Sequence, residues 1–104
     1  MKVTWSKKAL RKLHHTADYI AEEFGAERAG RFIDQAIDAA KQLEQFPKLG
    51  QEEPSLFEAE HEYRRRVVTK QSRFIYRIQK DKVRVVDFWA SKRNPALLLA
   101  GLLD

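Results

Sequence analysis

The sequence predicts an α+β fold, in which one small, antiparallel-rich sheet packs against an N-terminal helical hairpin in the order β-α-α-β-β-β-(α). In the first half, two segments repeat apolar residues every three or four positions, a spacing typical of amphipathic helices. The region 61–90 instead holds three short runs of strand-forming residues separated by turn-forming ones. At 104 residues the chain can build one core but not two, so we expect a single domain over 1–104.

The first expected elements are a strand and a helix. Residues 1–5 alternate apolar and polar side chains, which predicts a short strand. Ser6 is suited to cap the helix that follows, because its hydroxyl can accept from the free amides of a first helical turn. Gly25 is expected to end that helix, since glycine readily takes a left-handed conformation. The apolar stripe of this helix is Leu10, Leu13, Ala17, Ile20 and Phe24.

A second stripe with the same spacing predicts a second helix. Its many alanines allow close approach to a neighbour, and the short connection makes the two helices an antiparallel hairpin. The stripe is Ala29, Phe32, Ile33, Ala36, Ile37, Ala40 and Leu43. Beyond it Pro47, Gly50 and Pro54 interrupt the pattern, so 46–54 is expected to be a loop.

Three strands are expected next, at roughly 61–70, 73–79 and 83–90, with a tight turn at 80–82. The last strand is apolar on both faces, so it should be flanked on both edges and covered by helices. Asn94 and Pro95 then suit the N-cap and the first position of a short C-terminal helix.

Composition narrows the classes of protein that the chain can represent. There is no cysteine, which excludes disulfides and thiolate metal sites. The opening residues lack the apolar run of a signal peptide, and the longest apolar run, 96–103, is too short to span a bilayer. We therefore expect a cytoplasmic protein without a membrane partner.

The net charge of +5 is unevenly distributed. Residues 1–60 have nine Lys and Arg against eleven Asp and Glu, giving −2, whereas residues 61–104 have eleven against four, giving +7. A basic half of this kind indicates an anionic or acidic partner, although a solvated basic surface would give the same pattern.

The basic residues of the strands suggest a site on the open face of the sheet. Because strand side chains alternate, Arg64 and Arg66 share one face. The opposite set is expected beneath the helices and consists of Tyr63, Val67, Phe74, Tyr76 and Ile78. The open-face set is then Arg64, Arg66, Lys70, Arg73 and Arg77, with Arg93 at its rim. Such a set suits phosphates, because arginine is permanently charged and binds phosphate oxygens in bidentate fashion. The alternative is a group of surface ion pairs that contribute little.

Other candidate residues point to no second site. His14 and His15 are adjacent on a helix and therefore diverge, so they do not form a chelating pair, and neither a metal nor a cofactor is expected. His61 lies next to the basic set and could shuttle a proton. Asp87, in an otherwise apolar strand, is expected to be a structural partner of Arg73 or Arg84.

Five segments in succession resemble the RelE/ParE superfamily of bacterial toxins, the toxic halves of type II toxin–antitoxin pairs. They are 4-TWSKKALRKLHHTADYIAEEF-24, 43-LEQFPKLG-50, 63-YRRRVV-68, 73-RFIYRI-78 and 86-VDFWASKRNP-95. The resemblance covers nearly the whole chain, including the order of its elements.

The resemblance implies one of two activities. RelE-like members cut mRNA in the ribosomal decoding site, and by their place on the strands Arg64, Arg66, Arg73 and Arg93 correspond to the basic residues that hold the reacting phosphate. Such members also need a proton-transfer residue, yet 95–104 contains no Tyr, His or Lys. ParE-like members inhibit DNA gyrase without that residue and are not nucleases. The long helical hairpin and the L-x-x-x-P-x-x-G connection resemble the ParE-like branch, which we favour.

The resemblance also implies a protein partner. Toxins of this superfamily are neutralised by an antitoxin, and its amphipathic helix and acidic tail could cover the helical groove and the arginines, giving a hetero-oligomer. A non-catalytic nucleic-acid-binding module or corepressor is the remaining alternative.

Overall fold

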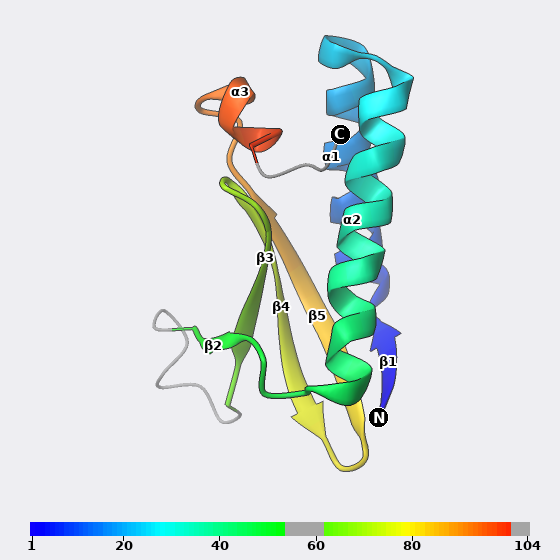
Figure 1. The fold of residues 1–104 in the computed structure, drawn as a ribbon, viewed down its shortest axis with the longest axis vertical. Helices are drawn as coiled ribbons and strands as arrows, with labels where there is room; N and C mark the ends of the chain where they lie inside the picture. Colours follow the sequence, from blue (N-terminus) through cyan, green and yellow to red (C-terminus); the bar gives the residue numbers. More distant parts are fainter. Residues whose placement is uncertain (54–61, 101–104) are drawn as a thin grey trace.

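The structure, a computed structural model, describes residues 1–53 and 62–100 and has an α+β architecture (Figure 1). The five-stranded sheet has the order β1-β5-β4-β3-β2, in which β1 and β5 are parallel and the other neighbours antiparallel. The elements are β1 (Lys2–Trp5), α1 (Lys7–Phe24), α2 (Ala26–Gln45), β2 (Gln51–Glu52), β3 (Arg64–Thr69), β4 (Ser72–Gln79), β5 (Lys82–Ala90) and α3 (Pro95–Leu98). The predicted fold class is confirmed, and β5 is flanked on both edges as expected.

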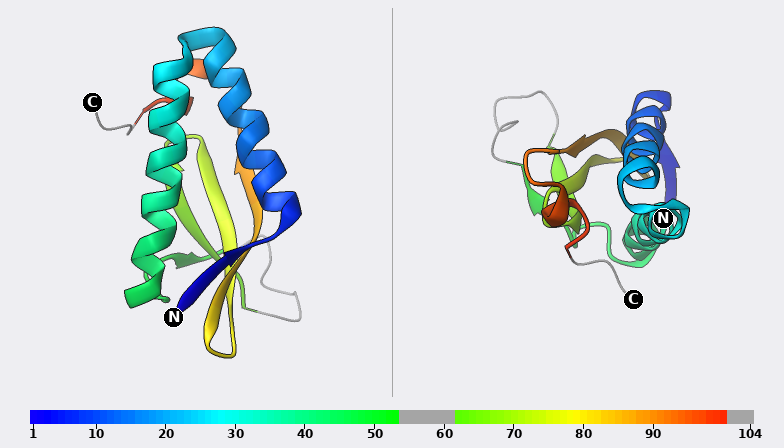
Figure 2. Two further views of the ribbon diagram at one scale, coloured as in Figure 1. Left: turned by 90° about the vertical axis from the view of Figure 1, so that its right-hand side faces the viewer. Right: turned by 90° about the horizontal axis from the view of Figure 1, so that it is seen from above.

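The helical hairpin begins and turns at the residues that the sequence indicates. The Ser6 Oγ accepts from the Ala9 amide at 3.0 Å and donates to the Val86 carbonyl at 3.0 Å, so the same hydroxyl caps α1 and ties it to β5. Gly25, with φ of 100°, separates the two helices, a backbone conformation that favours glycine. Figure 2 shows α1 and α2 lying side by side across one face of the sheet.

The core lies between this hairpin and the sheet. Trp5 packs against Phe74 with ring centroids 5.5 Å apart, and Phe32 meets Phe88 edge to face at 6.0 Å. Most of the predicted apolar stripes are buried, but Leu10 and Ile37 are about two-fifths exposed. Leu13 and Ala36, by contrast, are buried. The buried face of each helix is therefore narrower than the full set of apolar residues in its predicted stripe.

The connection after α2 contains a strand that the sequence did not predict. β2 is only two residues long and pairs with the start of β3. Ahead of it, the Tyr76 hydroxyl accepts from the Gly50 amide at 2.9 Å and donates to the Pro47 carbonyl at 2.8 Å. Two hydrogen bonds with the Tyr76 side chain of β4 therefore hold Pro47 and Gly50 of the connection in place.

The short helix α3 lies at the end of the sheet, above the β3–β4 turn (Figure 1). Asn94 precedes α3 in an extended conformation, although its side chain makes no capping hydrogen bond. Leu98 is buried in the core, so this part of the apolar segment 96–103 packs within the chain, while 101–104 lies outside the described residues. Among the helices that the structure describes, none has the length and apolar character needed to cross a membrane.

Candidate functional site

The pairing register places the predicted basic residues on two different faces of the sheet. Arg64 is opposite Tyr76, and Arg66 is opposite Phe74. Because directly paired residues point to the same face, and both aromatics are in the core, Arg64 and Arg66 lie on the helix-covered face. The prediction that these two arginines lie on the open face is therefore wrong.

Alternation shows which β3 residues share a face, but only the register with β4 shows which face meets the helices. Val67 was expected beneath the helices, yet it pairs with Arg73 on the open face and is 55% exposed. The register then shifts between Val67 and Thr69, so that Val68 and Thr69 are both buried. A bulge breaks strict alternation and cannot be recognised from periodicity alone.

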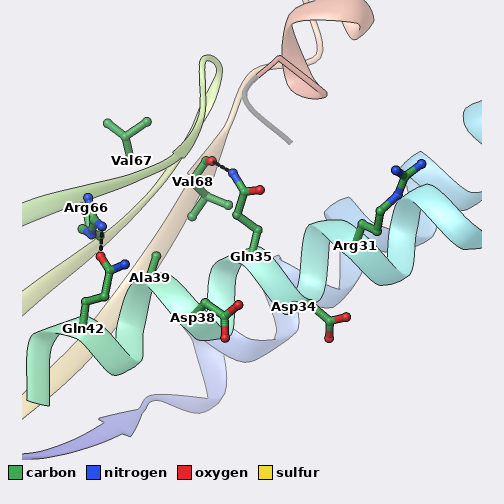
Figure 3. Close-up of a pocket in the computed structure, with 9 residues that line it drawn as sticks. All are labelled: Arg31, Asp34, Gln35, Asp38, Ala39, Gln42, Arg66, Val67 and Val68. Atoms are coloured by element: carbon green, nitrogen blue, oxygen red, sulfur yellow. Dashed lines mark hydrogen bonds between the residues drawn. The ribbon is translucent and has the colours of Figure 1, made fainter. Parts of the chain in front are cut away.

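The two arginines on the covered face bond to groups of the protein itself. Arg64 Nη1 donates to the Gly50 carbonyl at 2.7 Å, and Nη2 pairs with Glu62 at 2.8 Å. Arg66 donates through Nη2 to the Gln42 side chain on α2 (Figure 3). These contacts join β3 to its surroundings, so both guanidinium groups have structural partners.

Arg66 also borders a groove of about 430 Å³ between α2 and β3 (Figure 3). The groove is lined by Arg31, Asp34, Gln35, Asp38, Ala39, Gln42, Arg66, Val67 and Val68. Gln35 spans it and donates to the Val68 carbonyl at 2.7 Å. Its walls combine both signs of charge with exposed apolar surface, which suits a peptide better than a small anion.

The open face retains a dense group of cations. By register it bears Arg65, Arg73, Arg77 and Arg84. Arg77 and Arg84 are direct cross-strand partners, and the repulsion between their like charges is destabilising. Glu53 is the buried counter-charge at the other end, 3% exposed, with its Oε2 3.4 Å from Arg73 Nε and 3.8 Å from Arg65 Nη1.

A chain of contacts fixes Arg73 on this face. Its guanidinium lies 5.0 Å from the centre of the Trp89 ring, a cation–π arrangement. The Trp89 Nε1 donates to Asp87 Oδ2 at 2.9 Å. Asp87 in turn pairs with Lys12 at 2.8 Å and Lys8 at 3.3 Å, both on α1. The partner of Asp87 is thus a lysine pair one helical turn apart, and the prediction of Arg73 or Arg84 is wrong.

The electrostatics of Asp87 follow from these contacts. Burial alone would raise its pKa, but hydrogen bonds from Lys12, Trp89, the Phe88 amide and Lys8 outweigh burial and lower the pKa from 3.8 to about 2. The carboxylate is therefore charged throughout the physiological range and holds the indole in place.

Three of the predicted residues converge on one basic hollow at the end of the sheet, with a volume of about 490 Å³. Lys70 is in the β3–β4 turn, Arg73 is on β4, and Arg93 follows β5. The complete lining is Lys70, Gln71, Arg73, Trp89, Ala90, Ser91 and Arg93, with no acidic residue among these described residues. Arg77 is on the same face but does not line the basic hollow.

Backbone hydrogen bonds hold the rim of the basic hollow. The Lys70 amide donates to the Ala100 carbonyl at 3.0 Å, and the Ser91 amide donates to the Gln71 carbonyl at 2.9 Å. The Arg93 amide donates to Ser91 Oγ at 3.3 Å. The cations thus project from anchored segments, an arrangement that can bind an anion.

Sequence reasoning missed Glu53 and the orienting role of Trp89. Glu53 stood among several loop acids with nothing to single it out. Asp87 and Trp89 are two apart on one strand, which is a signal that they share a face. Elsewhere, no group of three potential metal ligands occurs within 1–53 and 62–100, both His14 and His15 are exposed, and His61 lies outside the described residues.

The comparisons with known proteins agree with this architecture. No curated protein matches the chain significantly in sequence. A structure titled "Chromosomal ParDE TA system from P. aeruginosa" has a TM-score of 0.71 at 20% identity, covering 86% of this chain and 95% of that one. Another, "YoeB/ParE toxin from Agrobacterium tumefaciens", has a TM-score of 0.59 at 18% identity, covering 88% and 99%. At these identities the likeness concerns the fold.

A family model gives the assignment. Residues 3–95, nearly the whole described chain, match the model of the ParE toxin of the type II toxin–antitoxin system parDE. The chain therefore belongs to the ParE toxin family of type II toxin–antitoxin systems.

Proposed function

We propose that this toxin inhibits growth by poisoning DNA gyrase and is neutralised by a cognate antitoxin. The toxin role follows from the family. The choice of gyrase over ribosomal mRNA cleavage rests on the geometry of the arginines and on the residues that follow Arg93.

The main support is that the basic residues required by an mRNA-cleaving site do not surround a single position. Arg73 and Arg93 line the basic hollow, whereas Arg64 and Arg66 lie on the opposite face and bond to Gly50 and Gln42. In addition, 95–104 contains no Tyr, His or Lys to transfer a proton. General acid–base catalysis typically contributes about 10²–10⁴-fold, so a nuclease built from these residues would be slow.

Two surfaces suit the antitoxin. One is the groove between α2 and β3, bordered by Arg31 and Arg66. The other is an apolar hollow of about 560 Å³, lined by Met1, Gln45, Phe46, Pro47, Lys48, Leu49 and Ile78. An amphipathic helix with an acidic tail matches this combination, because apolar burial supplies affinity and acidic groups complement the arginines.

Induced expression in growing cells tests the target. A gyrase poison should stop DNA synthesis and trigger DNA-damage signalling while translation initially continues. Rapid loss of translation with intact DNA would instead support the mRNA-cleaving alternative. Normal growth, together with binding to operator DNA in complex with the antitoxin, would support the corepressor alternative.

A substitution in the apolar hollow tests the antitoxin surface. Phe46 is 61% exposed, so Phe46→Ser should leave the fold intact and weaken the purified toxin–antitoxin complex by about tenfold or more, through loss of a buried aromatic contact. The matched control is Ile37→Ser on the outer face of α2, which should leave affinity unchanged. Equal affinities for the Phe46 variant and the wild type would place the antitoxin elsewhere.

A further inference from the structure

We infer that the basic hollow lined by Lys70, Arg73, Trp89 and Arg93 binds a phosphate group, and that the phosphate belongs to a single strand of nucleic acid. The inference deepens the proposed function, since it names the chemical group that the toxin contacts when gyrase holds DNA. Only the role of this binding at gyrase rests on the proposed function, because the binding itself is a property of these residues.

The first argument is the charge balance of the basic hollow. Lys70 and Arg93 are exposed, and neither has an acidic partner among the described residues. Arg73, the third cation of the basic hollow, has Glu53 3.4 Å from its Nε. Three cations with a single nearby counter-charge leave a net positive potential in the basic hollow, which an anion relieves.

The second argument is that Arg73 is already positioned. The Trp89 ring supports its guanidinium at 5.0 Å, and the indole is itself held by Asp87. On its Nε side Arg73 faces Glu53 at 3.4 Å. A side chain held on two sides loses little conformational freedom when it binds, so more of its interaction energy appears as affinity.

The third argument concerns the size and surroundings of the basic hollow. A volume of about 490 Å³ is much larger than one phosphate group, and the Trp89 indole provides an apolar surface for the attached sugar or base. From there the open face continues through Arg65, Arg77 and Arg84. A positively charged surface beside a partly exposed aromatic ring is the combination that single strands use, with phosphates on cations and bases on rings.

Equilibrium binding of a fluorescently labelled single-stranded oligothymidylate to the purified toxin tests the inference. Lys70→Ala, Arg73→Ala and Arg93→Ala should each lower affinity about tenfold, the typical loss for a hydrogen bond to a charged group. The matched control, Arg28→Ala, removes the same charge from an exposed position on α2 and should have little effect. Equal losses in all four variants would overturn the inference, since only overall charge would then matter.

The salt dependence of binding to the wild-type toxin gives a second measurement, which requires no variant. Three phosphate contacts to a single strand should give a slope of about −2 in a plot of log affinity against log salt concentration. In the Lys70 and Arg93 variants the slope should become shallower by about 0.7, the contribution of one phosphate contact. Both side chains are exposed, so the melting temperatures of these variants should match the wild type. An unchanged slope in both variants would contradict the site.

Competitors distinguish the possible sources of the anion. If inorganic phosphate displaces the labelled oligonucleotide only at a far higher concentration than unlabelled oligonucleotide does, the ligand is a nucleic-acid strand. If the two act at comparable concentrations, the strand is overturned and the site binds free phosphate. Polyglutamate is the third competitor. If it displaces the labelled oligonucleotide as effectively as unlabelled oligonucleotide does, the ligand is an acidic peptide and the choice of phosphate is overturned. Loss of oligonucleotide binding in these variants with undiminished gyrase inhibition would overturn the inferred role of the site when gyrase holds DNA, while strand binding and the proposed function would both stand.

Discussion

The hydroxyl of Tyr76, in the middle of β4, lies 2.9 Å from the amide nitrogen of Gly50, in the connection between α2 and β2. The same hydroxyl donates to the Pro47 carbonyl. A single buried phenol thus satisfies two backbone groups of a segment that has little regular structure, and it brings the connection against the sheet where Arg64 can reach the Gly50 carbonyl.

Replacing Tyr76 with phenylalanine should therefore destabilise the protein by about 1–3 kcal/mol, because a buried donor and acceptor lose their partner while the ring remains. Urea unfolding measures the difference. Tyr19→Phe is the control, since the ring beneath Lys92 is retained and the free energy of unfolding should hardly change. Comparable stabilities of the Tyr76 variant and the wild type would show that these two hydrogen bonds contribute nothing.

Alanine at Gly50 should be more damaging than the loss of the hydroxyl. A Cβ there would lie 2.3 Å from the Arg65 carbonyl oxygen and 2.7 Å from the Tyr76 hydroxyl, so backbone must shift. Gly30 is the counterpart, because nothing lies within 4 Å of its Cβ position in α2. Gly30→Ala should stabilise by roughly 0.5–1 kcal/mol through helix propensity. Thermal unfolding should move in opposite directions for the two variants, and a shift of the same sign would refute this explanation.

The lowered pKa of Asp87 predicts that the free energy of unfolding decreases in acid. Its pKa is about 2 in the folded protein against 3.8 as the ordinary value, so the carboxylate contributes stability above pH 3.8 that is lost as the pH falls towards 2. A shift of this size corresponds to about 2 kcal/mol. Asp87→Asn should remove that contribution at neutral pH, and the difference from wild type should shrink through the acid window.

The control for this prediction is Asp34→Asn, on the exposed side of α2, which should change the free energy of unfolding by less than about 0.5 kcal/mol. The free energies of unfolding of the wild type and of Asp87→Asn should converge as the pH falls. If their difference stays constant from neutral pH to pH 2, the pairing of Asp87 with Lys8 and Lys12 does not contribute to stability.

The basic hollow should be required for toxicity. Combined replacement of Lys70 and Arg93 with alanine should abolish or strongly reduce growth inhibition on induced expression, while the melting temperature stays near the wild-type value because both side chains are exposed. The double variant Arg11→Ala with Arg28→Ala, which removes two exposed helical cations, should remain toxic. A fully toxic Lys70 and Arg93 variant would move the site of action away from the basic hollow.

Much of the fold was predictable because it depends on local patterns. The spacing of Leu13, Ala17 and Ile20 predicts a helix without knowledge of its partner, and Ser6 and Gly25 mark its ends by their own chemistry. The apolar run of β5 likewise predicts a strand with neighbours on both sides.

The composition of the site was predictable only in part, since it depends on pairing between distant residues. Alternation places Arg64 and Arg66 together, but only the register with β4 decides which face they occupy. The bulge at Val67 and Thr69 and the contact between Glu53 and Arg73 arise from tertiary packing. Lys70 and Arg73 both line the basic hollow, although alternation groups Lys70 with Arg64 and Arg66 and gives no sign of this proximity across the β3–β4 turn.

The most direct test of the proposed activity compares the two targets with one preparation of purified toxin. Gyrase with plasmid DNA should accumulate cleaved plasmid as toxin is added, and ribosomes programmed with a defined mRNA should leave the message intact over the same concentrations. Efficient cutting of the mRNA in the decoding site, with gyrase supercoiling unaffected, would contradict the account and assign catalysis to these arginines instead.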